Sequence, residues 1–500
     1  MPNASPPPEL VAAIDLGSNS FHMIVASPRQ GEMVVVDRLR EMVRLAAGLS
    51  PARHLTDEAQ QKALDCLQRF GQRLRNMPPG SVRAVGTNTL RVARNAEQFL
   101  VLAEQALGHP IEIIAGIEEA RLIYQGVAST LALDGKRRLV MDIGGGSTEY
   151  IIGVDQTPLQ KESLRMGCVS MSLSHFHDGK ITPKRFRRAV IAAQRELEPF
   201  EKTFRHGAWE QAVGASGTMR TVEKILVNSG WSKEGITPEG LNQLVDALLA
   251  AGHYDKLQLP ELSADRKPIL AGGVAVIYAS FKSLHIPRMR VADGALREGL
   301  LQDLLGRINH EDIRDRTVAA LAGRFHVDHE HAGRVRKTLA ELSAQLPPLG
   351  GVEQESAAQW LDWAAALHEI GLDIAHSDYH KHGAYVIENG DLPGFSRQDQ
   401  KLLATLVRFH RRKLSMKNFK ELVKPWDGAA FPMALLLRLA VLLHRSRQPA
   451  ALPPTALALA GPRVILRFPK DWLKDHPLTV ADLEQEAEYL LAAEMVLDYA

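Results

Sequence analysis

The chain of 500 residues contains only two cysteines, Cys66 and Cys168, which are far apart and in no metal-binding spacing. This excludes a disulfide-stabilised scaffold and favours a reducing compartment, so we expect a cytoplasmic protein. The net charge is also small, at +2 from 60 Lys and Arg against 58 Asp and Glu. No whole-molecule field therefore attracts a polyanion or a membrane surface, and nucleic acid is not an expected partner.

A long hydrophobic run is missing as well. The most apolar stretch, FPMALLLRLAVLLHR at 431–445, is interrupted by Arg438 and is too short to span a bilayer. The first ten residues, MPNASPPPEL, lack a basic region followed by an apolar core and do not resemble a signal peptide. We expect no stable membrane insertion, and we predict a disordered lead-in over residues 1–9.

The length exceeds what one hydrophobic core supports, so several domains are expected. The first 300 residues alternate strand and helix patterns, for example a helix over 56–75. VAAIDLG with FHMIVAS and KRRLVMDIG with TEYIIGV each form a strand–turn–strand built on Asp-x-Gly. This repeated plan predicts an α/β fold of two similar lobes, 10–127 and 128–306, facing a cleft.

The pattern changes after about residue 306. Residues 310–446 read as successive helices, which predicts an all-α domain over 307–447. The proline-containing stretch RQPAALPPT then precedes ALALAGPRVILRFP and TVADLEQEAEYLLAAEMV. These segments predict two strands and a helix, forming a small C-terminal α+β domain over 448–500.

A glycine-containing turn follows the first strand of each lobe. Glycine permits positive φ and close approach of a ligand to the main chain, and such turns bind anions, phosphate above all. A lone turn of this kind is as consistent with a tight hairpin. Two turns, each at the head of a lobe, favour phosphate binding. The predicted phosphate-binding residues are Gly17, Ser18, Asn19, Ser20, Gly144, Gly145, Gly146 and Ser147.

Carboxylates accompany both turns. Asp15 and Asp142 end strands, where they can hold a divalent cation directly or through water. Glu149 lies just beyond the second turn, where a buried carboxylate must bind metal or handle a proton. Glu118 and Glu119 open a helix; one can orient a water for attack on phosphorus, whereas the other is expected to serve only the helix terminus.

The motifs IDLGSNSFHMIV, GIEEARLIYQGV, LVMDIGGGSTE, GASGT and DGALREGLL occur in this order. They resemble the exopolyphosphatase/guanosine pentaphosphate phosphohydrolase (Ppx/GppA) family, which belongs to the actin, Hsp70 and sugar-kinase superfamily with ribonuclease-H-like lobes. LHEIGLDIAHSDYHKHGAYVIENGDLPGFS resembles the helical, HD-like domain of the long bacterial members. Leu16 stands where the family commonly has Ile.

The resemblance implies Mg²⁺-dependent hydrolysis of a terminal phosphoanhydride with release of orthophosphate. It implies that Glu119 is the general base and that Asp142 and Glu149 bind metal and position the water. Asp15, at the end of its strand, is a further candidate metal ligand. Arg91 in GTNTLRVA is either a phosphate clamp or a surface arginine. GASGT, residues 214–218, is either a nucleotide loop or a plain strand–helix turn. A monovalent cation such as K⁺ is a second candidate cofactor, and the resemblance implies a homodimer.

The helical region lacks a complete HD-type metal site. Such a site needs a His, a His-Asp pair and a distal Asp, whereas His368 is followed by Glu369 and Val441 stands at the distal place. Basic residues nearby form either a polyphosphate track or a solvated helix face. They are His376, His380, Lys381, His382, Arg411 and Arg412.

These expectations make an exopolyphosphatase the leading hypothesis, with inorganic polyphosphate as substrate. The alternative is hydrolysis of guanosine pentaphosphate (pppGpp) to the tetraphosphate at the same site. A continuous basic channel favours the first, and an aromatic slot for guanine favours the second. A sugar-type kinase lacks a sugar-side signature here. A sensor that only binds polyphosphate or an alarmone gains nothing from Glu119, Asp142 and Glu149 beside a polyanion.

Overall fold

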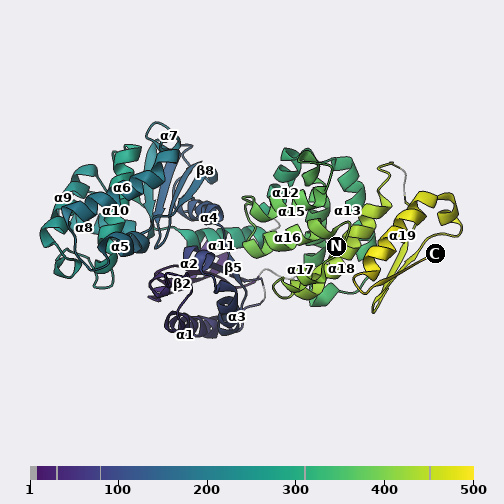
Figure 1. Ribbon diagram of the computed structural model, residues 1–500. Coiled ribbons are helices and arrows are strands. Elements are labelled where there is room, and N and C mark those ends of the chain that lie inside the picture. The colour runs from purple at the N-terminus through teal and green to yellow at the C-terminus, as the bar shows by residue number, and fades with distance from the viewer. Residues whose placement is uncertain (1–7, 30–31, 79, 309–310, 450–451) are drawn as a thin grey trace. The chain divides into compact units, whose positions relative to one another are not determined.

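The computed structural model describes residues 8–29, 32–78, 80–308, 311–449 and 452–500 (Figure 1). The chain divides into two compact units, Met1–Asp312 and Ile313–Ala500. The division falls six residues beyond the predicted end of the second lobe, because the last helix of the first unit, α11 (Leu296–Ile308), continues past residue 306.

The first unit contains two sheets with the same topology. The first has the strand order β3-β2-β1-β4-β5, with β1 antiparallel to β2 and parallel to β4. Its strands are β1 (Val11–Leu16), β2 (Phe21–Arg29), β3 (Glu32–Glu41), β4 (Val82–Gly86) and β5 (Ile111–Ile113).

The second sheet repeats this plan as β8-β7-β6-β9-β10, with β6 antiparallel to β7 and parallel to β9. Its strands are β6 (Arg137–Ile143), β7 (Thr148–Val154), β8 (Thr157–Leu164), β9 (Gln211–Ala215) and β10 (Arg290–Val291). The predicted duplication of a strand–turn–strand in two α/β lobes is therefore confirmed.

Helices cover both sheets. The first lobe has α1 (Asp57–Leu74), α2 (Asn88–Val92), α3 (Ala96–Leu107) and α4 (Gly116–Ala128), with a 3₁₀ turn η1 (Leu45–Gly48). The second has α5 (Cys168–Phe176), α6 (Pro183–Leu197), η2 (Glu198–Phe200), α7 (Glu201–Phe204), α8 (Ser216–Asn228), α9 (Pro238–Ala251), η3 (Tyr254–Lys256), α10 (Lys267–Leu284) and α11.

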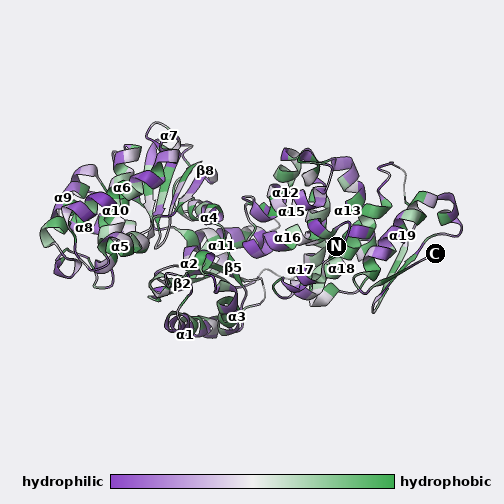
Figure 2. Cartoon of the chain, in the orientation of Figure 1, coloured by the Kyte–Doolittle hydropathy of each residue, from purple (hydrophilic) through white to green (hydrophobic). Residues whose placement is uncertain are grey.

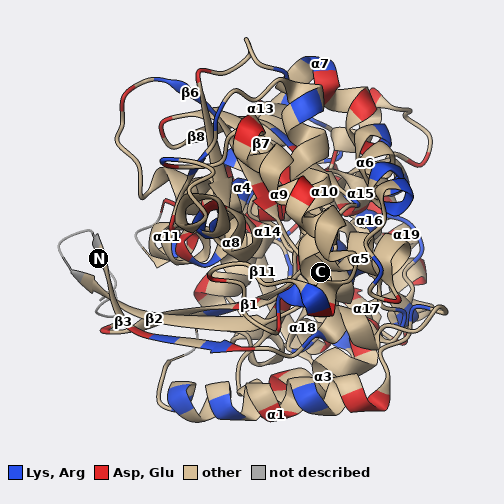
Figure 3. Ribbon diagram, turned by 90° about the vertical axis from the view of Figure 1, so that its left-hand side faces the viewer, with Lys and Arg blue, Asp and Glu red and all other residues tan. Residues whose placement is uncertain are grey.

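The predicted helix over 56–75 shows why these boundaries can be read from sequence. The Thr56 side chain accepts a hydrogen bond from the Ala59 N–H at 3.4 Å and so caps α1. Six side chains of α1, Cys66 and Phe70 among them, are buried, and charged residues of both signs lie along the helix (Figure 3). Hydrophobic and hydrophilic residues likewise alternate along the other helices that cover the sheets (Figure 2).

Helices α4 and α11 pack against both sheets and tie the lobes together. One buried cluster contains Val11 of β1 and Val140 of β6 with residues of both helices. Glycine makes the close helix contact possible, because a Cβ on Gly126 would lie 1.9 Å from the carbonyl oxygen of Ala295. A Cβ on Gly299 would lie 1.8 Å from the Leu122 carbonyl oxygen.

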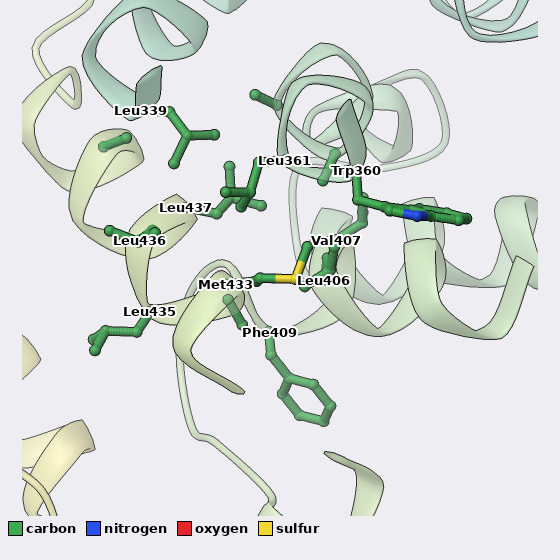
Figure 4. Packing of buried hydrophobic residues seen from close by; sticks show 14 of the residues in the cluster. Leu339, Trp360, Leu361, Leu406, Val407, Phe409, Met433, Leu435, Leu436 and Leu437 are labelled. Atoms are coloured by element: carbon green, nitrogen blue, oxygen red, sulfur yellow. The ribbon is translucent and has the colours of Figure 1, made fainter. Parts of the chain in front are cut away.

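The second unit is mainly helical, as predicted. Its helices are α12 (Ile313–Arg324), α13 (His329–Ser343), η4 (Leu349–Gly351), α14 (Gln354–Leu367), η5 (Ile370–Asp373), α15 (Tyr379–Asn389), α16 (Arg397–Phe409), α17 (Met416–Lys420), α18 (Trp426–Leu443), η6 (Trp472–Asp475) and α19 (Pro477–Leu491). Met433 of α18 points toward Leu406 and Val407 of α16 (Figure 4). The HD-like assignment of these helices stays a prediction.

The C-terminal segment shares this core. Leu466, Leu483 and Leu497 belong to the same buried cluster as the helices, although residues 448–500 were predicted as a separate small domain. The segment forms a sheet of the order β11-β12-β13, from Ala456–Ala460, Arg463–Arg467 and Val496–Tyr499. The third strand was missed, because four residues at the end of a helical pattern carry too little periodicity.

Helix α18 corrects the expectation about the apolar stretch. Among the described residues it alone is long and apolar enough, by length and composition, to cross a membrane. The helix is longer than the predicted run because it begins at Trp426 and continues through Pro432. Yet 61% of it is buried within the unit, where Arg438 forms an ion pair with Glu486. It is thus the central core helix of this unit.

Candidate active site

A cleft between the two lobes brings the glycine turns together. Its cavity has a volume of about 420 Å³. The lining includes every residue of both predicted phosphate turns, which are Gly17, Ser18, Asn19, Ser20, Gly144, Gly145, Gly146 and Ser147. Asp15, Glu119 and Asp142 line the same cavity.

The turns approach each other closely, and this explains their glycines. A Cβ on Gly145 would lie 2.7 Å from the Ser18 Cβ, and one on Gly146 would lie 2.3 Å from the Asn88 Oδ1. Positive φ is not the reason, because none of Gly17, Gly144, Gly145 and Gly146 adopts it. That part of the sequence argument was wrong: Gly145 and Gly146 lack space for a side chain beside Ser18 and Asn88 of the first lobe, and Gly17 lacks it beside a carbonyl oxygen of its own turn.

The register of β6 and β7 places two carboxylates of the second lobe side by side. Asp142 of β6 is directly opposite Glu149 of β7, so both side chains lie on one face of the sheet. The equivalent pair in the first lobe is Asp15 and His22. The duplicated lobes therefore differ at this point, since only the second provides two carboxylates.

Burial concentrates negative charge at this point. The pKa of Asp15 is raised to about 7 by burial and by the charges of Glu119 and Asp142. The pKa of Asp142 is also raised to about 7, by burial and by Glu119. Burial, Glu119 and Asp142 raise the pKa of Glu149 well above its usual range. Each carboxyl is thus penalised for its charge unless a cation is near.

Two oxygens of this group are buried without a hydrogen-bond partner, Oδ1 of Asp15 and Oε2 of Glu149. The other oxygen of Glu149 accepts a hydrogen bond from the Ser163 hydroxyl at 2.8 Å. Buried carboxylate oxygens normally have partners, and hard divalent cations bind such oxygens. The residues therefore fit the predicted divalent cation.

The two glutamates at the start of α4 have different partners. Glu119 accepts a hydrogen bond from Arg91 at 2.6 Å and faces the cleft. Glu118 instead pairs with Arg121, which also binds Asp303. Arg91, predicted as a phosphate clamp or a surface arginine, is neither exposed nor on the cleft wall, since its side chain is buried against Glu119 and the Ile114 carbonyl.

A cluster of basic side chains on the cleft wall was missed by the sequence reasoning. Arg40, Arg220, Lys224, Arg266 and Arg297 line the cavity. Four of them, together with burial, lower the pKa of His22 to about 3, with Arg297 as the strongest charge. Arg297 lies in the quoted motif DGALREGLL and could have been chosen, whereas the others are scattered over β3, α8 and the start of α10 and only the fold collects them.

The GASGT segment also reaches the cleft. Ser216, Gly217 and Thr218 line the cavity where β9 ends and α8 begins. Ser216 has a φ of 86°, and its hydroxyl is buried without a partner. A non-glycine residue in this conformation is strained, and such strain concentrates at ligand sites.

The basic residues predicted as a track are only partly together in the second unit. His376, Arg411 and Arg412 line a pocket of about 560 Å³. His380 is buried, and Lys381 pairs with Asp378 at the surface. His382 is half-buried on α15 and does not line this pocket. These six residues therefore form no continuous surface.

Two family models match this chain. The Ppx/GppA phosphatase family model matches residues 24–308, and the model of Ppx/GppA phosphatase domain III matches residues 313–487. The chain belongs to the Ppx/GppA phosphatase family. It is a hydrolase of phosphoanhydride bonds.

Two relatives that match nearly the whole chain share one name. The guanosine-5'-triphosphate,3'-diphosphate pyrophosphatase of Aeromonas hydrophila is 40% identical over 479 residues, covering 96% of each chain. The protein of that name from Pseudoalteromonas translucida is 37% identical over 98% of each chain. An exopolyphosphatase structure from Cytophaga hutchinsonii has a TM-score of 0.53 at 23% identity, over 60% of this chain and 98% of that one. An Aquifex aeolicus family member has a TM-score of 0.51 at 22% identity, over 61% of this chain and 100% of that one. Both structures share a fold with about 60% of this chain.

Proposed function

We propose that this phosphatase hydrolyses the 5′-terminal phosphoanhydride of guanosine 5′-triphosphate 3′-diphosphate, releasing orthophosphate and the tetraphosphate. The relatives of matching length carry this activity in their name. The observation that carries the proposal is the similarity to these relatives over 96–98% of the chain. The basic wall of the cleft suits either substrate, since a nucleotide with two phosphate groups and a polyphosphate chain both need cations beyond the catalytic turns. The leading expectation from sequence, an exopolyphosphatase, thereby becomes the second candidate.

The reaction needs a water aimed at the terminal phosphorus and stabilisation of the charge on its oxygens. Glu119, held by Arg91 at the cleft, is the group placed to accept the water's proton. Asp142 and Glu149, paired across β6 and β7, would orient the reacting centre. The two turns would hold the terminal phosphates, with the Ser18 and Ser147 hydroxyls as donors.

A divalent cation fits the carboxylate cluster. Asp15, Asp142 and Glu149 would hold Mg²⁺, directly or through water, as their raised pKa values and two unpartnered oxygens suggest. Mg²⁺ bound there would neutralise charge on the phosphate oxygens. The chain's own part is to hold these carboxylates together at a place that Glu119 also faces, where the cation would keep them charged.

The basic wall would take the remaining phosphates. Arg220 and Lys224 lie one helical turn apart on α8, and Arg266 precedes α10. Guanidinium groups bind phosphate in a bidentate way and also stack on bases. They would therefore hold the 3′-diphosphate or the guanine while the 5′-terminus reacts.

One observation favours the second candidate, inorganic polyphosphate. Among the described residues that line the cleft there is no Phe, Tyr or Trp, so an aromatic slot for guanine is missing. A polyphosphate chain needs only the turns and the arginines. Recognition of guanine would then rest on arginine stacking and polar contacts.

The test is orthophosphate release by the full chain with Mg²⁺, on the nucleotide and on long-chain polyphosphate at equal concentrations of terminal phosphate. We expect a higher kcat/KM on the nucleotide. Arg220→Gln and Arg266→Gln should raise KM for the nucleotide about ten-fold, with a smaller change in kcat. A higher kcat/KM on polyphosphate would make the second candidate the function, and absence of release from both would refute both.

A further inference from the structure

The pocket of the second unit contains a cluster that the reaction does not use. His331 lies on α13, His368 follows the last residue of α14, and Glu369 comes next. All three side chains are buried, and each offers one ligand atom within 4.8 Å of the others. The sequence predicted no complete metal site in this region, because an HD-type site needs a further Asp where Val441 stands.

The distances within this cluster suit a small cation. Nε2 of His331 lies 3.8 Å from Oε1 of Glu369, and Nε2 of His368 lies 3.9 Å from the same oxygen. Tetrahedral Zn²⁺ with bonds of about 2.1 Å places neighbouring ligand atoms about 3.4 Å apart. Binding would thus draw each of these two nitrogens toward Glu369 by only a few tenths of an ångström.

The orientation of His368 is the strongest sign of a ligand. Its Nδ1–H donates to the Ala365 carbonyl oxygen at 2.7 Å, which leaves the lone pair on Nε2. That Nε2 is buried and has no hydrogen-bond partner. A metal-binding histidine characteristically has its other ring nitrogen fixed in this way, and an unpartnered buried nitrogen calls for an explanation.

Arg447 occupies the place beside Glu369 that a cation would take. Its Oε1 accepts a hydrogen bond from Arg447, which also lies 3.5 Å from Asp328. The Arg447 side chain is 45% exposed, so it can move into solvent. A bound cation would replace this guanidinium at Glu369, and Arg447 would keep Asp328 as its partner.

We propose that His331, His368 and Glu369 bind a divalent transition metal of the Zn²⁺ class. Two imidazole nitrogens and one carboxylate select such an ion over Mg²⁺, which prefers an all-oxygen shell. With three protein ligands, the fourth position stays open. It faces the pocket, which His331 and Glu369 line together with Val441, Arg411 and Arg445.

The test is a titration of the full chain with Co²⁺ and then Zn²⁺, in saturating Mg²⁺ so that the carboxylates of the cleft are occupied. We expect one Co²⁺ per chain with the visible absorption of a histidine-bound ion, displaced by Zn²⁺. His368→Gln should weaken Co²⁺ binding at least ten-fold. His380→Gln, a change at another buried histidine outside the cluster, should leave it unchanged. Loss in both variants, or in neither, would overturn the proposal.

Two further results keep the proposal falsifiable if His368→Gln fails to fold. The wild-type chain must bind Co²⁺ in excess Mg²⁺, and the absence of a histidine-type spectrum would refute the site. Arg447→Gln removes the competing guanidinium and should tighten Co²⁺ binding about ten-fold. Unchanged or weaker binding in this variant would show that Arg447 does not compete with a cation for Glu369, and would overturn the proposed site. Phosphate release is not the readout, so failure here leaves the proposed function untouched.

Discussion

Arg91 donates a hydrogen bond from Nη1 to Oε2 of Glu119 at 2.6 Å, and both side chains are about nine-tenths buried. Glu119 is therefore held in one orientation at the cleft. Its charge in turn raises the pKa values of Asp15, Asp142 and Glu149. One ion pair thus sets both the position of the proposed base and the charge state of the proposed cation site.

Glu119→Gln should abolish most of the phosphate release. The amide keeps the shape of the side chain but cannot accept a proton, and general base catalysis contributes about 10²–10⁴-fold. The change relieves repulsion with three neighbouring carboxyls but also removes the counter-charge of the buried Arg91, so these two effects on the free energy of unfolding should largely offset each other. Steady-state kinetics and urea unfolding of the same preparation measure both effects. A variant that keeps half of the wild-type kcat would remove Glu119 from the mechanism.

The neighbouring Glu118→Gln is the matched control. Glu118 binds Arg121 through two hydrogen bonds, at 2.7 and 2.6 Å, within a buried network that includes Asp303. Losing this charge should lower the free energy of unfolding by about 1–3 kcal/mol, with kcat changed less than two-fold. The two adjacent glutamates should therefore separate stability from catalysis.

Stability without Mg²⁺ should fall as the pH rises from about 4 to about 7. Asp15 and Asp142 have an ordinary pKa of 3.8 and folded values of about 7. Between these values the folded chain binds more protons than the unfolded chain, so raising the pH favours unfolding, by about 2 kcal/mol or more. Urea unfolding in EDTA across this pH range measures the effect.

Mg²⁺ should reverse this loss at high pH and have little effect at low pH, since protons and the cation compete for the same carboxylates. The Mg²⁺-induced gain in unfolding free energy should thus be larger at pH 7.5 than at pH 5. Asp142→Asn should reduce the difference between the two conditions. A gain that is equal at both pH values would contradict a cation at these residues.

Gly145→Ala should reduce activity about ten-fold or more. The added Cβ would lie 2.7 Å from the Ser18 Cβ, so the two phosphate turns must move apart. Gly323→Ala is the control, because nothing lies within 4 Å of its Cβ and the residue stands in α12. It should leave kcat unchanged and stabilise the helix by about 0.5–1 kcal/mol. Equal kinetics in both variants would show that the turns tolerate separation.

The sequence predicted what depends on local pattern. The Asp-x-Gly hairpins, the helix capped by Thr56 and the helical second unit follow from periodicity and turn chemistry. The basic wall does not, since Arg40, Arg220 and Arg266 are separated by 180 and 46 residues and only the tertiary fold brings them to one cavity. The pairing of Arg91 with Glu119 is hidden for the same reason.

The reason why the second phosphate turn needs glycine could not be predicted from the sequence either. A Gly-rich turn predicts freedom of φ, whereas the structure requires Gly145 and Gly146 because Ser18 and Asn88 of the other lobe lie against them. A steric demand made by residues far away in the sequence leaves no local pattern. His331 and His368 illustrate the same limit, since a motif that lacks its last member still folds three potential ligands together.

The ion pair in the core of the second unit should contribute more to specificity than to stability. Arg438 binds Glu486 at 2.5 and 2.8 Å and donates to the Phe409 carbonyl at 2.8 Å, with its side chain fully buried. Glu486→Gln leaves a buried guanidinium without its counter-charge and should lower the free energy of unfolding by about 3–5 kcal/mol. Arg438→Met alone should have an effect of similar size.

The double variant Arg438→Met with Glu486→Leu should recover most of this loss, because the buried charges disappear together. Urea unfolding of the four chains gives the coupling energy. Strict additivity of the two single losses would show that the pair does not act as a unit, and that α18 is anchored to α19 by packing alone.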